Sequence, residues 1–170
     1  MVNTSSTTNN KTANKSENKD TEKNKVFQQV KQFLHYLDYG KGWDACKAYC
    51  IDNGNASFDC QSDALAGIET VAAYALWMQD FVANVSPEFH IDIHSCSFCE
   101  ETMTVAYVAT FHGKHTGPGG PGPATHNEFS TDYAYLVKID EDEDDKVQSV
   151  KKIWNDGYTM KQLGWTKDKK

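Results

Sequence analysis

The spacing of the apolar residues changes once along this 170-residue chain, near Phe89, and this change constrains the fold most strongly. Before Phe89, apolar side chains recur at the spacing of an amphipathic helix. After Phe89, apolar and polar residues alternate, which is typical of strands with one buried face. Helices followed by strands predict an α+β fold, in which helices gathered on one side cover a curved, mixed but mostly antiparallel sheet.

Three helices are predicted in the first half of the chain, over residues 26–40, 43–50 and 67–86. Apolar residues occupy one face of each, and a glycine or a proline marks most of their ends. Residues 56–60 have the composition of a short strand between the second and third helices. The helical layer is therefore expected to precede the long strands.

Four long strands are predicted to follow, with alternating stretches beginning at Phe89, Val105, Glu128 and Val147. A loop rich in glycine and proline, residues 117–123, joins the second strand to the third. It lacks the helix and the Lys-Ser/Thr pair of a phosphate-binding loop. The acidic run 140–145 (DEDEDD) lacks the glycine and alternating ligands of a calcium loop and is predicted to be a hairpin turn.

The last strand carries a column of polar and aromatic residues. In an extended chain Lys152, Trp154 and Asp156 project from one face, and Val147, Ser149 and Ile153 from the other. Asn155 or Asp156 can cap a short C-terminal helix that Gly164 ends. A cation, an aromatic plane and a carboxylate in one column are compatible with a small-molecule site. The alternative is structural, with Trp154 in the core, Lys152 solvated and Asp156 only a helix cap.

Histidines and cysteines offer few metal-ligating patterns. The column of His90, Asp92 and His94 is most simply the polar outer face of a strand, so we expect no metal. The five cysteines are odd in number and are expected to be free thiols. His115 differs, since it continues the apolar, aromatic column of Val105, Tyr107 and Phe111.

Composition excludes several classes of partner. The net charge is -7 and the chain contains no arginine, which disfavours binding to nucleic acid. No apolar run approaches the length of a membrane span, and no signal peptide is recognised. We expect a cytoplasmic protein, with organelle targeting by the N-terminal segment as an alternative. Residues 1–24 are predicted to be a disordered tail, 25–166 one domain, and 167–170 a C-terminal tail.

Two segments resemble the SnoaL-like branch of the nuclear transport factor 2-like (NTF2-like) superfamily. They are HTGPGGPGPATHNEFSTDYAYLV, residues 115–137, and KIWNDGYTMKQLGW, residues 152–165. The resemblance implies a cone in which three N-terminal helices, a curved sheet and a short C-terminal helix enclose an apolar pocket. It also implies a homodimer formed through the outer sheet face.

The resemblance also implies which residues form the site. Asp156 matches the acid/base aspartate of the polyketide cyclases, and His115 the histidine of a His-Thr-Gly turn. No pair of a tyrosine and a protonated aspartate, as in ketosteroid isomerases, is recognised, and a hydrolase-like relay is excluded because the chain has no arginine. The expected pocket residues are Lys152, Trp154, Tyr107, Phe111, Tyr74 and Trp77.

The family hosts several activities, so two functions are carried forward. The first is a cofactor-independent cyclase or isomerase that acts on a small, mostly apolar carbonyl compound. The second is a non-catalytic module that binds a small apolar or aromatic ligand or forms dimers. An acid and a base lining one closed cavity would favour the enzyme. A pocket filled by Tyr107, Phe111 and Trp154 would favour the module.

Overall fold

Helices and strands separate along the chain as predicted. The computed structural model describes residues 9–51 and 55–166. Its helices are α1 (Asn9–Asp38), α2 (Trp43–Cys46), α3 (Val71–Asn84) and α4 (Asp156–Leu163), with short 3-10 turns η1 (Lys47–Tyr49) and η3 (Asp63–Leu65). Thr70 caps α3 by accepting a hydrogen bond from the amide of Ala73, so this helix begins after Gly67 rather than at it.

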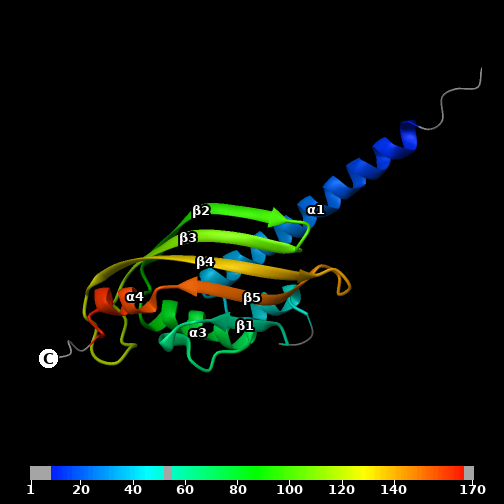
Figure 1. Cartoon of the computed structure of the whole chain (residues 1–170). Helices are drawn as coiled ribbons and strands as arrows, with labels where there is room; N and C mark the ends of the chain where they lie inside the picture. The colour runs from blue at the N-terminus through cyan, green and yellow to red at the C-terminus, as the bar shows by residue number, and fades with distance from the viewer. Residues whose placement is uncertain (1–8, 52–54, 167–170) are drawn as a thin grey trace, which may run out of the picture.

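A five-stranded mixed sheet forms the other layer, in the order β1-β5-β4-β3-β2. Its strands are β1 (Ser57–Cys60), β2 (Phe89–Cys99), β3 (Thr104–Lys114), β4 (Glu128–Asp140) and β5 (Lys146–Trp154). Only β1 pairs in parallel, with β5, and the other three pairings are antiparallel. In Figure 1 the strands β2 to β5 lie side by side and α1 passes behind them. The predicted α+β plan is confirmed.

The core lies between the helices and the inner face of the sheet. Phe33, Leu34 and Leu37 of α1 are almost fully buried, as are Val105 of β3 and Tyr135 of β4. The alternation predicted for β3 and β4 is confirmed, because every second side chain is buried along β4 and from Val105 to Phe111 of β3, where Thr110 is buried as well. The inner face is unusually rich in aromatic residues, and the contacts among them shape the site described below.

The predicted alternation fails at the start of β5. Val147 was expected to share a face with Ser149, but Val147 and Val150 are both buried. The cause is a register shift, since Ile139 pairs with Val147 whereas the preceding Lys138 pairs with Ser149. A bulge of this kind inserts one extra residue into the strand, so the side chains that follow it lie on the opposite face from the one expected.

The first helix is longer than predicted. It begins at Asn9, whereas residues 9–24 were assigned to a disordered tail, and its N-terminal half projects away from the sheet (Figure 1). Among the side chains of α1 that are described, from Asn24 onward, the first to enter the core is Val26. Residues 1–8 and 167–170, the rest of the two predicted tails, lie outside the described residues. Among the helices of the described part, none is long and apolar enough to cross a membrane.

Candidate binding site

The cone encloses a small cavity of about 30 Å³ between α1, α3 and the sheet. This volume suits one water-sized molecule, so aromatic side chains fill most of the interior. Two charged residues are part of its wall, Asp38 at the end of α1 and Lys152 on β5. The remaining lining residues are Trp77, Met78, Phe81, Phe111, Phe129, Thr131, Tyr133, Tyr135, Trp154 and Thr159.

Asp38 is the buried carboxylate of this site, with 2% of its surface exposed. The hydroxyl of Tyr133 donates to its Oδ2 at 2.6 Å, and that of Tyr135 donates to its Oδ1 at 3.0 Å. Burial raises the pKa of Asp38, against the hydrogen bond from Tyr133 and the charge of Lys152, which lower it. The two tyrosines compensate part of the cost of burying this acid.

Lys152 is the buried cation of the site, with 7% of its surface exposed. Its Nζ lies 4.8 Å from the ring centre of Trp154 and 5.1 Å from those of Tyr74 and Tyr133. Aromatic faces attract a cation and stabilise it where water is excluded. Burial nevertheless lowers the pKa of Lys152 to about 8, against the attraction of Asp38, which raises it.

A chain of hydrogen bonds connects the two charged groups. Lys152 Nζ donates to the hydroxyl of Tyr74 at 2.6 Å, and the hydroxyls of Tyr74 and Tyr135 lie 2.7 Å apart. Because Tyr135 donates its own proton to Asp38, the consistent arrangement has Tyr74 donating to Tyr135. We refer to Lys152, Tyr74, Tyr135 and Asp38 as the relay. Each hydrogen bond of the relay is donated in the same direction, from the amine of Lys152 toward the carboxylate of Asp38.

A second set of polar contacts holds Trp154 at the wall of the cavity. Its indole Nε1–H lies 2.9 Å from Thr131 Oγ1 and 3.0 Å from Thr159 Oγ1. The hydroxyl of Thr159 donates to that of Thr131 at 2.7 Å. These bonds connect β4, β5 and α4, so the C-terminal helix fixes the orientation of an aromatic wall.

Most of the predicted pocket residues do meet. The cavity is lined by four of them, Lys152, Trp154, Phe111 and Trp77. Tyr74 is not a lining residue, but its hydroxyl accepts a hydrogen bond from Lys152. Tyr107 is not a lining residue, but its ring lies 6.2 Å from Tyr133 and 6.1 Å from Tyr135, and its hydrogen bond to Asp38 helps to lower the pKa of that acid. Whether any of them binds a ligand stays a prediction.

His115 is not among the residues that line the cavity. It is fully buried beneath the glycine- and proline-rich loop. Its Nε2 lies 2.8 Å from the carbonyl oxygen of Gly119, its Nδ1 accepts from the amide of Thr125 at 3.2 Å, and its ring meets Trp165 edge-on. The contacts of His115 thus hold the loop and the C-terminal segment together.

Asp156 is also absent from the cavity wall. Its carboxylate accepts hydrogen bonds from the Ser62 hydroxyl at 2.8 Å and the Ala64 amide at 3.1 Å, and so connects α4 to η3. Burial raises the pKa of Asp156, but these bonds and those from backbone amides together lower it. The helix cap is Asn155, which accepts from the amide of Tyr158. The catalytic roles of His115 and Asp156 stay predictions.

Asp38 is the site residue that sequence reasoning missed. It follows Leu34 by four residues and therefore lies on the apolar stripe of α1. An acid on the buried face of an amphipathic helix was the available signal. Tyr133 and Tyr135 both donate hydrogen bonds to Asp38, and this contact differs from the ketosteroid isomerase pair, in which a tyrosine and a protonated aspartate both donate to a ligand oxygen.

No family model and no curated protein sequence matches the chain. Solved structures do match. AclR of Streptomyces galilaeus, assigned as a hydroxylase, has a TM-score of 0.63 at 12% identity over 85% of this chain and 87% of its own. A protein assigned as a SnoaL-like polyketide cyclase from Jannaschia sp. CCS1 has a TM-score of 0.62 at 14% identity, over 82% and 94%.

An epoxide hydrolase of the LEH-like type from M. tuberculosis has the same fold, with a TM-score of 0.53 at 13% identity over 81% of this chain and 88% of its own. These likenesses establish the architecture. The chain has the same fold as these solved structures, among them the SnoaL-like protein, and this is the fold that the resemblance in its sequence implied.

Proposed function

We propose that this protein binds a small, mostly apolar molecule carrying one hydrogen-bond-accepting oxygen inside the cone. The observation that carries the proposal is the ammonium group of Lys152, buried at the wall of a cavity that is otherwise largely aromatic. An ammonium has three N–H donors, and within the described residues Lys152 makes one hydrogen bond, to Tyr74. A ligand oxygen would accept a charge-assisted hydrogen bond from it.

The size of the cavity limits the ligand and requires movement. About 30 Å³ is too small for any organic molecule, so binding must displace side chains. Trp77 and Trp154 line the cavity and are only half-buried, with ring centres 6.4 Å apart. They are the side chains through which we expect a ligand to enter. A compound about the size of cyclohexanone fits this account better than a large polycyclic one.

Tryptophan fluorescence tests this proposal, because two of the four tryptophans line the cavity. Titration with acetophenone, an aromatic ketone, should quench the emission in a saturable manner. Trp77→Phe should remove much of that change, whereas Trp43→Phe, outside the cavity, should not. Quenching that is linear in the ketone concentration and identical in all three proteins would contradict a binding site here.

A second candidate is a cofactor-independent isomerase or cyclase, and the relay favours it. With a pKa of about 8, a fraction of Lys152 is a neutral amine near neutral pH. This amine could accept a proton from the carbon beside a ligand carbonyl while the hydrogen bonds of Tyr74 and Tyr135 shift protons toward Asp38. Acid–base catalysis of this kind contributes about 10²-fold or more.

Exchange of the α-protons of cyclohexanone in D₂O, followed by NMR, distinguishes the two functions. An enzyme would accelerate the exchange, and Lys152→Met would abolish the acceleration. Saturable binding without accelerated exchange would support the non-catalytic binding module instead of the enzyme. His115→Gln and Asp156→Asn should be measured in the same assay, because the family resemblance implies acid–base roles for His115 and Asp156.

We further propose that two copies pair through the outer face of the sheet. Ile153, Ala134 and Val108 are cross-strand neighbours that form an apolar row there. Ile153 is 57% exposed and Val108 is 39% exposed. Aliphatic side chains in a row across a sheet are typical of surfaces that another molecule covers.

A further inference from the structure

The outer face of the sheet also brings together three metal-ligating side chains that are not adjacent in the sequence. His90 and Asp92 are two residues apart on β2, so their side chains project from the same face. His112 on β3 is the direct cross-strand partner of His90. On the opposite face, Phe89 and Phe111 stack with ring centres 4.9 Å apart and anchor both strands to the core.

We propose that His90, Asp92 and His112 form a binding site for a divalent transition-metal ion of the zinc type. Their potential ligand atoms all lie within 4.8 Å of one another. His112 Nε2 and Asp92 Oδ2 are already 3.3 Å apart. Two ligands that each lie about 2.1 Å from a tetrahedral zinc ion are about 3.4 Å apart, so this pair already has the required separation.

His90 completes the site with a small movement. Its ring stacks on that of His112, with centres 4.5 Å apart and planes inclined by 10°. Bringing its nitrogen from at most 4.8 Å to the separation found in a tetrahedral site requires a shift of roughly 1.5 Å. His90 is exposed, so rotation of its side chain can provide this without disturbing the core. The backbone of two paired strands keeps the three ligands together.

The set of ligands selects the class of ion. Two imidazoles and one carboxylate suit zinc and its neighbours in the first transition series, whereas magnesium and calcium prefer oxygen ligands. The column considered in the sequence, His90, Asp92 and His94, differs from this site by one residue. The Nε2 of His94 lies instead 2.7 Å from Thr110 Oγ1, and Thr110 donates to Asp132.

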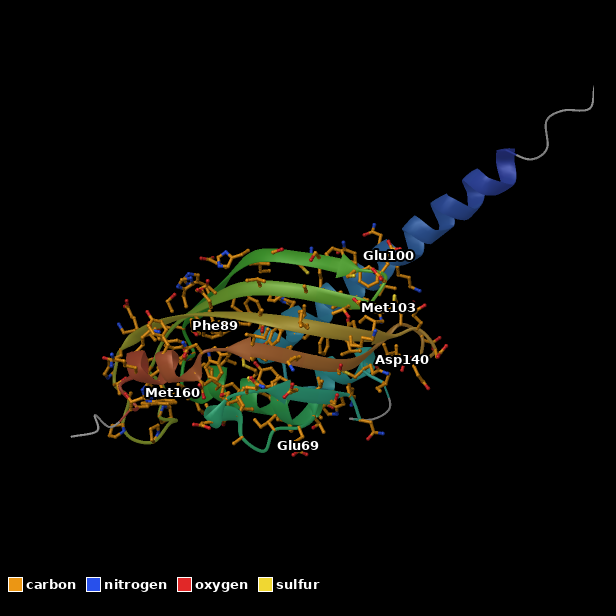
Figure 2. The ribbon with its side chains drawn as sticks, in the orientation of Figure 1. Glu69, Phe89, Glu100, Met103, Asp140 and Met160 are labelled. Atoms are coloured by element: carbon orange, nitrogen blue, oxygen red, sulfur yellow. The ribbon has the colours of Figure 1, made fainter. Side chains whose placement is uncertain are left out.

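An adjoining hollow leaves the remaining coordination positions accessible. A groove of about 600 Å³ borders His90 and His112 at the end of the sheet, with Glu88, Lys114, Glu128 and Gln162 among its lining residues. Phe89, the neighbour of His90, lies at the same end of the sheet as Met160 of α4, and the turn at Asp140 lies at the opposite end (Figure 2). Water or an external ligand can reach an ion bound there. The net charge of -7 favours the approach of a cation.

Calorimetric titration with Zn²⁺ of the tag-free full-length chain, previously dialysed against a chelator, tests the site. We expect His112→Gln and Asp92→Asn each to weaken Zn²⁺ binding by at least about tenfold. His94→Gln is the matched control, since it removes an exposed histidine from the same strand, and it should leave the affinity unchanged. The free thiols, such as the exposed Cys99, give a background that all four proteins share.

NMR of the imidazole nitrogens identifies the ligands independently. Addition of Zn²⁺ should shift the signals of His90 and His112 and leave those of His94 and His115 in place. Equal affinity in the wild type and His112→Gln, or an equal loss in His94→Gln, would overturn the proposal. Shifts confined to other histidines would do the same. The pocket inside the cone plays no part in this test, so its outcome is independent of the proposed ligand binding in that pocket.

Discussion

Lys152 Nζ lies 2.6 Å from the hydroxyl oxygen of Tyr74, and this contact joins the last strand to the long helix α3 in the centre of the molecule. Tyr74 is fully buried and its ring stacks on Phe58 at 4.1 Å. One phenolic oxygen thus accepts from a buried cation and continues the relay toward Asp38. That single oxygen therefore connects the buried cation to the rest of the relay.

Replacing Tyr74 with Phe removes the oxygen and keeps the ring. Lys152 then loses its hydrogen-bond partner and Tyr135 loses a donor, so we expect a loss of roughly 1–3 kcal/mol in the free energy of unfolding. Urea denaturation measures it. Tyr158→Phe is the matched control, since Tyr158 is 57% exposed, and it should change stability little. Equal effects of the two substitutions would contradict the role of the relay.

Lys152 should make stability depend on pH in the alkaline range. The folded protein releases this proton near pH 8, whereas an unfolded lysine releases it near 10.5. Between these values the unfolded chain binds more protons at this lysine, so the contribution of Lys152 to stability should rise with pH, by roughly 3 kcal/mol across the window. The buried Cys46 and Cys50, whose pKa values are raised to about 12, act in the opposite direction, so the contribution of Lys152 is measured as a difference from a variant that lacks it.

Lys152→Met supplies the reference for this measurement. The free energy of unfolding is measured with urea at pH 7 and pH 10 in both proteins. As pH rises, the wild type should become more stable relative to Lys152→Met. A difference between the two proteins that stays constant with pH would show that Lys152 does not have the lowered pKa.

Asp156 should contribute to stability through its bonds to η3. Asp156→Ala leaves Ser62 and Ala64 without their acceptor, with an expected cost of about 1–2 kcal/mol. Because the pKa of Asp156 is lowered, this contribution is present above the usual pKa of an aspartate and is lost as pH falls through the folded value. Thermal unfolding at pH 7 and pH 3 measures both effects.

The conservative variant Asp156→Asn separates stability from chemistry. It keeps an acceptor oxygen, so it should cost less stability than Asp156→Ala and leave ketone binding intact. A protein that stays stable but loses accelerated α-proton exchange would instead support the catalytic role that the family resemblance implies.

The outer sheet face provides a test of self-association. Ile153→Lys places a charge in the apolar row and should convert a dimer to a monomer, as measured by light scattering during gel filtration. Leu76→Lys is the control, because Leu76 on α3 is 54% exposed, close to the 57% of Ile153, but lies on the helical side. A wild type that is monomeric at all concentrations, or dimers that survive Ile153→Lys, would contradict the proposed interface.

Much of the fold could be predicted because local patterns determine it. The alternation of Tyr133, Tyr135 and Val137 identifies the inner face of β4, and the apolar stripe of α1 identifies its buried side. The glycine- and proline-rich segment forms the loop between β3 and β4 as expected. Strand periodicity placed Lys152 on the same face as Trp154 but left open whether it is solvated, and the structure buries it.

The site could be predicted only in part, because its chemistry depends on contacts between distant segments. Asp38 and Tyr133 are 95 residues apart in the chain, and no local pattern pairs them. His112 joins His90 only through the register of β2 and β3. Likewise, the position of Asp156 in the sequence matches a catalytic residue, but its direction depends on where η3 lies.

The affinity for cyclohexanone, compared with methylenecyclohexane, tests the central claim most directly. The two molecules have nearly the same shape, and only the ketone can accept a hydrogen bond from Lys152. Calorimetry on the wild type should show tighter binding of the ketone, by roughly 10-fold or more, the value of a charge-assisted hydrogen bond. In Lys152→Met the preference should disappear while the hydrocarbon still binds. A preference of equal size in both proteins, or no binding of either compound by the wild type, would contradict the account.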